Sequence, residues 1–385
     1  MTDRALLLRI AFNQLMGWGT LFVPFTLFIE PMEQELGWSR AEISGAFTVA
    51  LLVSGLAAIP VGRFVDRQGG RWPLGLGALA GAALLAAWAL NHSLIGFYGI
   101  WFLMGLVQAV ALWTPAMAVV VSLASQPLRV ITGITFITGF TATLFLPLSD
   151  LLITQLGWRG ALLVLAALEA AAGLLALRHF AGAAPPAPKP GTPRSPLREA
   201  LRRPAFWGLA LLLSAHSFAG VALGAHIVPL LREKGLPEAS VILLAALHGP
   251  FQVAARAVLF LLGDRVRLAS VGLLSTALMA PAMAWLALAP PSFPWLVLFA
   301  MAWATADGLV SIVRAGAPAE ILGKEGYGAV TGALAMVSAP PRAFAPVVVA
   351  LIWQWSGGYG PAIWALAAAG LLALGGLVVA LADRR

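Results

Sequence analysis

Three arginines stand inside long apolar stretches of the sequence, where a charged side chain could hold an anion. They are Arg256, Arg314 and Arg342. An ionisable residue at membrane depth costs about 2.5–3.5 kcal/mol on insertion scales, which favours a functional role. Arginine stays charged at any relevant pH, and its planar guanidinium matches a carboxylate with two parallel hydrogen bonds. The arginines predict an anion-binding site. The alternative is a structural ion pair or a side chain that snorkels to the membrane interface.

Histidines and acidic residues in the same stretches could carry protons. We name His216, Asp307 and Glu169 as proton-coupling candidates. His216 and Asp307 should both lie near mid-bilayer, and histidine ordinarily titrates near pH 6.5. Alternatively, a membrane histidine is a hydrogen-bonding packing residue, and the acids pair with arginines. Asp307 and Arg314 are seven residues apart, two helical turns along one face, which would allow a water-bridged pair. The histidines in these stretches are His216, His226 and His248.

Polar residues at similar depth could complete the lining of a binding cavity, although packing between helices is the alternative for most of them. The predicted substrate-binding residues are Arg256, Arg342, Arg314, Gln252, Asn13 and Gln108. The chain has no cysteine, and its five histidines have no regular ligand spacing. It also lacks a phosphate-binding loop of the GxxxxGK[ST] type. We therefore expect no metal, no cofactor and no nucleotide-driven pump.

The composition shows what kind of elements must position these residues. Of 385 residues, 10% are charged and 60% are hydrophobic, and the mean hydropathy is +0.90. A soluble domain has about 25% charged residues, so most soluble enzymes and disordered scaffolds are excluded. The net charge is +8, but the basic residues form no continuous patch, and we expect no nucleic-acid partner. The lipid bilayer is the expected solvent.

Twelve apolar windows are long enough to cross a bilayer as helices, at about 20 residues for a 30 Å core. They are too long and too uniformly apolar for barrel strands, so we predict an all-α membrane protein with a retained first span. Prolines 340, 341 and 346 should break the eleventh helix locally. The windows lie near 6–30, 41–63, 72–90, 94–125, 130–155, 160–178, 205–231, 239–263, 268–289, 294–322, 327–354 and 359–381.

The loop charges predict the orientation of the spans. Lysine and arginine concentrate on the side of the two termini and of the central loop. By the positive-inside rule this side is cytoplasmic, and we expect a bacterial inner membrane. The opposite loops carry only Arg40, Arg159, Arg232 and Lys234.

A proline-rich segment, residues 179–203, predicts a semi-rigid cytoplasmic linker between an N-terminal half (1–178) and a C-terminal half (204–385). The halves repeat each other. Glu35 and Asp66 recur as Glu233 and Asp264 with one offset of 198 residues. Two six-helix halves in parallel imply a pseudo-twofold axis along the membrane normal and a cavity near mid-bilayer.

The segment GRFVDRQGGR, residues 62–71, resembles the signature of the major facilitator superfamily between its second and third spans. The resemblance covers essentially the whole chain and implies twelve helices in two pseudo-symmetric halves. It also implies that the signature latches a cytoplasmic gate and is not the substrate site. The gate residues implied in the two copies are Gly62, Asp66, Arg67, Arg71, Asp264 and Arg265.

The segment ELGWSRAEIS, residues 35–44, looks like the monocarboxylate transporters and the oxalate/formate exchangers, whose substrates are small organic anions. The resemblance gives Arg256 the role of holding the substrate carboxylate and makes Arg342 a second cation opposite it. Those proteins often have an acidic residue four positions before the arginine, where this chain has Gln252. Their proton-coupling route therefore does not carry over.

These observations predict a secondary active transporter that moves small organic carboxylates by alternating access, through proton symport or anion exchange. Its expected partners are the anion, protons and lipid, and it is expected to be a monomer. The alternative within transport is efflux of cationic or drug-like compounds by proton antiport. A membrane enzyme would need a nucleophile, metal or acid/base constellation, and a sensor would need a sizeable soluble domain; the sequence offers neither.

Overall fold

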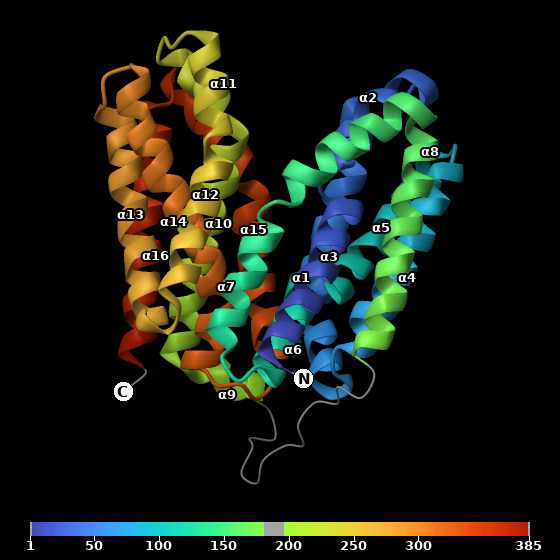
Figure 1. Ribbon diagram of the computed structural model, residues 1–385. Coiled ribbons are helices and arrows are strands. Elements are labelled where there is room, and N and C mark those ends of the chain that lie inside the picture. The colour runs from blue at the N-terminus through green and yellow to red at the C-terminus, as the bar shows by residue number, and fades with distance from the viewer. Residues whose placement is uncertain (1, 181–195, 384–385) are drawn as a thin grey trace. The chain divides into compact units, whose positions relative to one another are not determined.

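The computed structural model describes residues 2–180 and 196–383. The backbone of residues 40, 41, 68, 238 and 264 is described, but their side chains are not. Most of the linker predicted at 179–203 therefore lies outside the described residues. The remainder of the chain is helical, with short connections (Figure 1).

The order of the helices follows the predicted spans. They are α1 (Asp3–Leu21), α2 (Phe25–Leu36), α3 (Arg40–Gln68), α4 (Arg71–Leu90), α5 (Leu94–Ala111), α6 (Trp113–Leu123), α7 (Pro127–Thr138), α8 (Thr141–His179), α9 (Pro196–Arg202), α10 (Pro204–Glu233), α11 (Glu238–Ala246), α12 (His248–Leu262), the 3₁₀ turn η1 (Gly263–Arg265), α13 (Leu268–Leu288), α14 (Phe293–Ile321), α15 (Tyr327–Ser356) and α16 (Gly360–Ala382).

Within the described residues, eleven helical stretches are long and apolar enough to cross a membrane. The longest, Pro127–His179, covers two predicted spans, and its backbone leaves the helical conformation at Gly157, where φ is 70°. The all-α membrane architecture predicted from the sequence is confirmed. Three other predicted spans are each made of two helices, α1 with α2, α5 with α6, and α11 with α12.

The break predicted in the eleventh span is wrong. Helix α15 continues through Pro340, Pro341 and Pro346 without interruption. Proline removes one backbone donor and clashes with the preceding turn, but transmembrane helices tolerate it when neighbouring groups satisfy the freed carbonyls.

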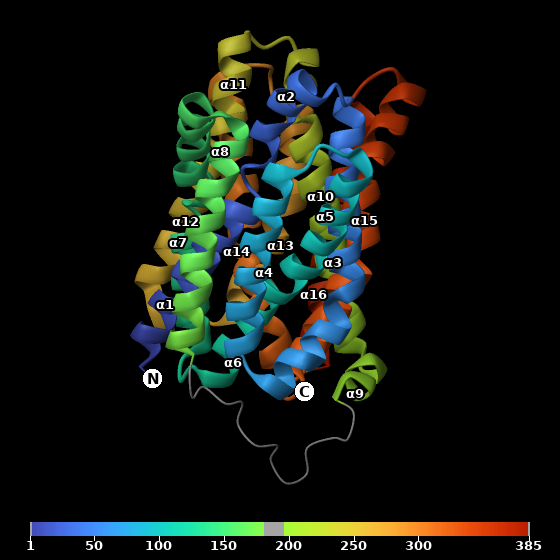
Figure 2. The ribbon, with the colours of Figure 1, turned by 90° about the vertical axis from the view of Figure 1, so that its right-hand side faces the viewer.

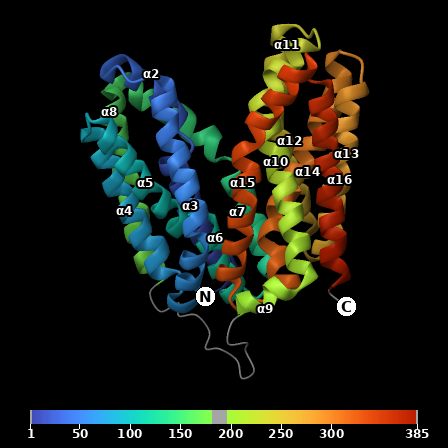
Figure 3. The same ribbon diagram turned by 180° about the vertical axis from the view of Figure 1, so that it is seen from behind.

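The described residues form two compact units. One contains residues 2–180 and 325–333, and the other contains residues 196–324 and 334–383. In the first unit, α4 lies along α8 and α3 lies along α5 (Figure 2). In the second, α16 packs against α10 and α13, and α14 packs against α13 and α12 (Figure 3).

Small residues set the close helix contacts of the second unit. A Cβ atom added to Gly376 on α16 would lie 2.5 Å from the carbonyl oxygen of Gly208 on α10 and 2.8 Å from the amide of Leu212. Helices in lipid associate through such close approach, because burial of apolar surface gives no driving force between them there.

The repeated glutamates make the same kind of contact in both units. Glu35 accepts a hydrogen bond of 2.5 Å from the indole of Trp158, and its other oxygen pairs with Arg159 at 2.8 Å. Glu233 accepts from the indole of Trp353 and from the backbone amide of Tyr359, both at 2.7 Å. In both units, therefore, the repeated glutamate at a helix end accepts a hydrogen bond from a tryptophan indole.

Asp66 in the last turn of α3 holds the beginning of α15, whose first residues belong to the same unit. Its carboxylate accepts hydrogen bonds from the backbone amides of Gly328, at 2.8 Å, and Ala329, at 3.0 Å. The first amides of a helix have no partner within the helix, and its N-terminus carries positive partial charge. Asp66 supplies both the acceptor and the compensating charge.

Replacing Gly376 tests the close contact between α10 and α16. We expect Gly376→Ala to destabilise the protein by about 1–3 kcal/mol because the added methyl must push the backbones apart. Gly375→Ala is the matched control, since an added Cβ there meets nothing within 4 Å. Thermal unfolding in detergent would show a lower Tm for the first variant alone. An equal Tm for both variants would contradict the packing described.

Replacing Asp66 tests its role at the start of α15. Asp66→Ala should cost about 0.5–2 kcal/mol, the usual range for loss of a helix N-terminal acceptor. Asp66→Asn keeps one oxygen acceptor and should lose less. The exposed Arg63, one turn earlier on α3, gives the control Arg63→Ala. If the Tm of all three variants matched that of the wild type, the helix-capping role would be excluded.

Candidate functional site

The second unit contains a cavity of about 590 Å³ between α10, α11, α12, α14 and α15. Two of the three predicted arginines line it, Arg314 and Arg342. Asp307, Trp303 and Phe299 line it as well. The cavity therefore combines charged groups with apolar and aromatic walls, as ligand sites usually do.

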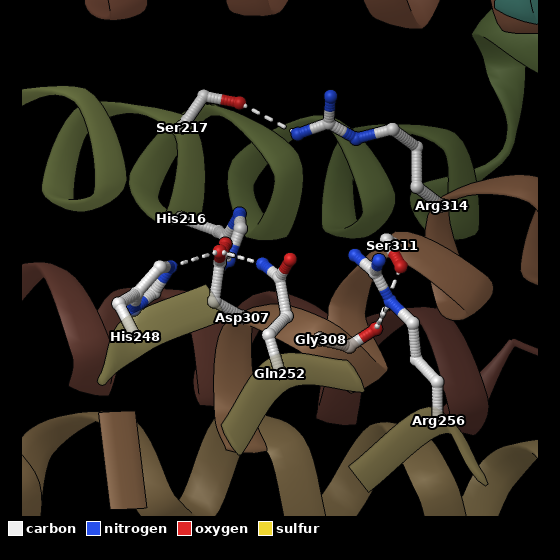
Figure 4. A network of polar contacts seen from close by, with 9 residues as sticks. All are labelled: His216, Ser217, His248, Gln252, Arg256, Asp307, Gly308, Ser311 and Arg314. Carbon is white, nitrogen blue, oxygen red and sulfur yellow. Dashed lines mark hydrogen bonds and ion pairs between the residues drawn. The ribbon is translucent and has the colours of Figure 1, made fainter. Parts of the chain in front are cut away.

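Asp307 on α14 is the centre of a polar cluster within this cavity (Figure 4). Its Oδ1 atom lies 3.0 Å from Nε2 of His216 on α10. Its Oδ2 atom lies 3.1 Å from Nε2 of His248 and accepts a hydrogen bond of 2.5 Å from the amide nitrogen of Gln252, both on α12. Three helices thus meet at one carboxylate.

Helical spacing explains why α12 reaches this carboxylate twice. His248 and Gln252 are four residues apart, and so are Gln252 and Arg256, which places all three side chains along one face of the helix. Gly308 on α14 lets that face come close, since an added Cβ would lie 2.9 Å from the backbone oxygen of Gln252. The geometry of the cluster depends on this glycine.

Arg314 lies two turns beyond Asp307 on α14. Its Nη2 atom donates a hydrogen bond of 2.9 Å to the hydroxyl of Ser217, the residue next to His216. The guanidinium of Arg342 on α15 lines the same cavity. The structure therefore brings two cations to the same cavity.

Arg256 occupies a different place from the other two arginines. Its side chain is 8% exposed, and its Nε atom donates a hydrogen bond of 3.3 Å to the carbonyl oxygen of Gly308. The hydroxyl of Ser311 shares this acceptor at 2.6 Å (Figure 4). Arg256 lies next to the polar cluster, whereas Arg314 and Arg342 line the cavity itself.

Asn13 and Gln108, predicted to bind substrate, are buried in the first unit. There Gln14 donates hydrogen bonds to the side-chain oxygen of Asn13, at 3.2 Å, and to the carbonyl of Ala111 at the end of α5, at 3.0 Å. Gln108 donates one of 3.1 Å to the carbonyl of Leu21 at the end of α1. The amides of Gln14 and Gln108 thus satisfy backbone carbonyls where α5 and α1 end.

Glu169, the third proton-coupling candidate, is buried on α8 with 1% of its surface exposed. The hydroxyl oxygen of Thr20 lies 2.7 Å from one of its carboxyl oxygens and 3.0 Å from the carbonyl of Met16. A hydroxyl has one proton, so both contacts are hydrogen bonds only when Glu169 is protonated. The geometry is compatible with a proton on this residue.

The residues of the gate signature are placed as follows. An alanine methyl at Gly62 would overlap the backbone of Gly328. Arg67 is exposed, and the guanidinium of Arg71 lies 4.7 Å from the ring centre of Trp72. In the second copy Arg265 is exposed on η1, whereas the side chain of Asp264 lies outside the described part of the chain.

Sequence reasoning named His248 only as one of three membrane histidines and did not select it as a site residue, and it did not name Ser217. The signal that could have found His248 is its spacing to Gln252 and Arg256, which repeats every four residues. For Ser217 the sequence carries no comparable signal, because its role depends on where Arg314 lies on another helix.

Solved structures with similar folds are membrane transporters. The E. coli fucose:proton symporter FucP, in an outward conformation, has a TM-score of 0.78 at 14% identity, with 97% of each chain covered. The human organic anion transporter MFSD10 has 0.69 at 18%, covering 98% of this chain and 100% of its own. The proton:xylose symporter XylE has 0.71 at 13%, covering 97% and 94%. These identities establish a shared fold only.

A comparison with curated proteins finds no match. The sequence does match the model of one protein family, described as the Major Facilitator Superfamily, over residues 10–346. This match covers most of the chain and agrees with the helical membrane fold and with the signature at residues 62–71. The chain belongs to the Major Facilitator Superfamily of membrane transporters.

Proposed function

We propose that this transporter moves small organic carboxylates across the membrane by secondary active transport. The observation that carries the proposal is the charge of the cavity in the second unit. Its described lining contains two guanidinium groups, Arg314 and Arg342, and a single carboxylate, Asp307. A site with an excess of permanent positive charge favours an anionic ligand.

Asp307 balances only one of the two guanidinium charges, so one positive charge remains in excess. Its two oxygens lie next to His216, His248 and Gln252. The hydrogen bond that Arg314 makes is to the neutral hydroxyl of Ser217. A carboxylate ligand would supply a second negative charge next to these half-buried guanidinium groups.

The size and walls of the cavity refine the substrate class. At about 590 Å³ it is within the usual range for small-molecule sites, about 300–1,000 Å³. Trp303, Phe299 and Leu244 line its apolar part. These dimensions suit a carboxylate with a hydrocarbon or aromatic body, and they leave ample room for the smallest anions.

The resemblance to the monocarboxylate and oxalate/formate branch supports the same substrate class. The resemblance assigns the carboxylate contact to Arg256. In the structure, Arg256 lies next to Gly308 and one helical turn beyond Gln252 on α12. We propose that Arg256 acts from behind the cavity by adding positive charge, while Arg314 and Arg342 face the ligand. The sugar symporters of similar fold act on neutral substrates, for which two arginines would have no matching charge.

Several further properties belong to this proposal. The two halves, 1–178 and 204–385, would rock about the bound anion in alternating access, with the segment 179–203 as their linker. The loop charges support cytoplasmic termini and a bacterial inner membrane, and we propose a monomer. The signature residues Gly62, Asp66, Arg67 and Arg71, with Asp264 and Arg265, would act at the cytoplasmic gate. Glu169, buried in the first unit, would be a protonation site.

Efflux of cations is the alternative, and it would need an acid free to meet a positive ligand. Asp307 is the acid in the cavity, and its contacts with two imidazoles and one amide argue against that role. The two neighbouring arginines would also repel a cation. Organic cations therefore serve as the negative control in the following experiment.

The test is a thermal-shift measurement on purified protein with acetate, lactate, benzoate and succinate, and with tetraethylammonium as the control. A ligand at about 100 times its Kd should stabilise the wild type by about 2.7 kcal/mol. Arg314→Gln and Arg342→Gln should abolish this shift because each removes one cation from the cavity. Arg256→Gln should weaken it.

The matched control is Arg267→Gln, which removes an arginine exposed outside the cavity in the same unit. Its carboxylate shift should equal that of the wild type. Stabilisation by tetraethylammonium alone, or unchanged carboxylate shifts in both cavity variants, would rule out the anion site.

A further inference from the structure

The cluster around Asp307 has more titratable groups than a structural carboxylate needs. One amide and one imidazole would satisfy both oxygens, yet two imidazoles are present, His216 from α10 and His248 from α12. Each ring approaches Asp307 through Nε2, so its second nitrogen, Nδ1, is the place where an additional proton would bind. An added proton converts the ring to an imidazolium without disturbing its contact to the carboxylate.

Protons and ligands in the cavity can reach this cluster. His216, His248 and Asp307 all line the cavity. The side chain of His248 is 38% exposed and that of Asp307 is 23% exposed, whereas His216 is 7% exposed. Among the described residues, Nδ1 of His216 has no hydrogen-bond partner. A proton on this buried nitrogen would displace no existing hydrogen bond.

The charged groups around the cluster come from three helices. Arg314 lies on α14 with Asp307, Arg256 on α12 with His248, and Arg342 on α15. The parts of α11 that line the cavity, Leu244 and Ala245, do not titrate, and α13 has no ionisable residue in its sequence. The arginines keep their charge at all relevant pH values, so the imidazoles are the cavity groups suited to take up and release a proton.

We propose that His216, Asp307 and His248 form the proton-binding site of this transporter, and that an anion in the adjacent cavity and a proton on this cluster favour each other's binding. The inference rests on the proposed anion site. A protonated imidazole adds a positive charge to the cavity and strengthens anion binding. By linkage, the bound anion strengthens proton binding by the same factor.

This coupling has a definite direction for transport. Anion and proton enter the cavity together and leave together, so a proton gradient drives the anion the same way, as in symport. The negative charge of Asp307 stabilises the imidazolium, which the neighbouring arginines would otherwise repel. Exchange of one anion for another would require no such change in the charge of the site.

The experiment measures how tightly lactate and benzoate bind as the pH is changed. Both probes are ionised above about pH 5.5, because the pKa of a carboxyl group is about 4. Their Kd should rise by about 5- to 100-fold between pH 6 and pH 8, because uptake of one proton changes Kd by at most about tenfold per pH unit. In weakly buffered solution with a pH dye, binding near pH 7 should take up protons from the solvent.

Variants assign the effect to the cluster. His248→Gln should reduce both the pH dependence of Kd and the proton uptake, and the double variant His216→Gln with His248→Gln should remove them. His92→Gln, on an exposed histidine in the other unit, is the control and should behave as the wild type. His248 is the more exposed of the two cluster histidines, so its single variant gives a test if changes at buried His216 prevent folding.

Three results have distinct meanings. Proton uptake with binding that is lost in the cluster variants supports the proposal. Carboxylate binding with a Kd that stays constant from pH 6 to pH 8, or with proton uptake that survives the double variant, overturns it and leaves the anion site in place. Absence of carboxylate binding to the wild type at every pH overturns the anion site itself, and the proton coupling falls with it.

Discussion

The cost of placing charge in an apolar environment governs the second unit of this transporter. Asp307 can stay at membrane depth because donors from two other helices surround its oxygens. The same contacts draw α10 and α12 towards α14, so the acid is also a point of attachment for three helices. Arg314 and Arg342 stay charged at any relevant pH, and this single acid balances only one of them, so the cavity keeps a net positive charge.

A related constraint acts on the backbone in the first unit. Helices α1 and α5 end within the span, at Leu21 and Ala111, and their last carbonyls have no partner in their own helix. Side chains of Gln108 and Gln14 supply the missing donors, each from the helix opposite. These two glutamines explain how irregular backbone persists where water is absent. They also show that a polar residue at membrane depth can serve the backbone instead of a ligand.

The fold could be predicted from the sequence because span length and hydropathy are set by the bilayer. The repeat of Glu35 as Glu233 could also be seen in the sequence, and both glutamates accept a hydrogen bond from a tryptophan indole. Helix ends inside spans could not be predicted in this way, since Leu112 and Phe22 are as apolar as their neighbours. The prolines of α15 caused the opposite error: they predicted a helix break that the structure does not have, because the effect of proline depends on the neighbouring helices.

For the candidate site, residue types indicated the chemistry, but the sequence could not show which side chains meet. A membrane helix is apolar on most of its surface, so periodicity does not reveal the face that contacts a given neighbour. The resemblance favoured Arg256 and Arg342 over Arg314, whereas the structure places Arg314 and Arg342 in the cavity lining and Arg256 outside it. The pairing of His248 with Asp307 depends on the register of α12 against α14, which no local pattern encodes.

The close approach of α12 at Gly308 means that the spacing of the site is fixed by a position with no side chain. Any larger residue there would move the helix that carries His248, Gln252 and Arg256 as one body, and would change every distance to Asp307 together. Substrate preference in related chains could therefore shift through residue 308 while every cavity-lining residue stays the same. A comparison of binding sites that considers only ligand contacts would overlook this position.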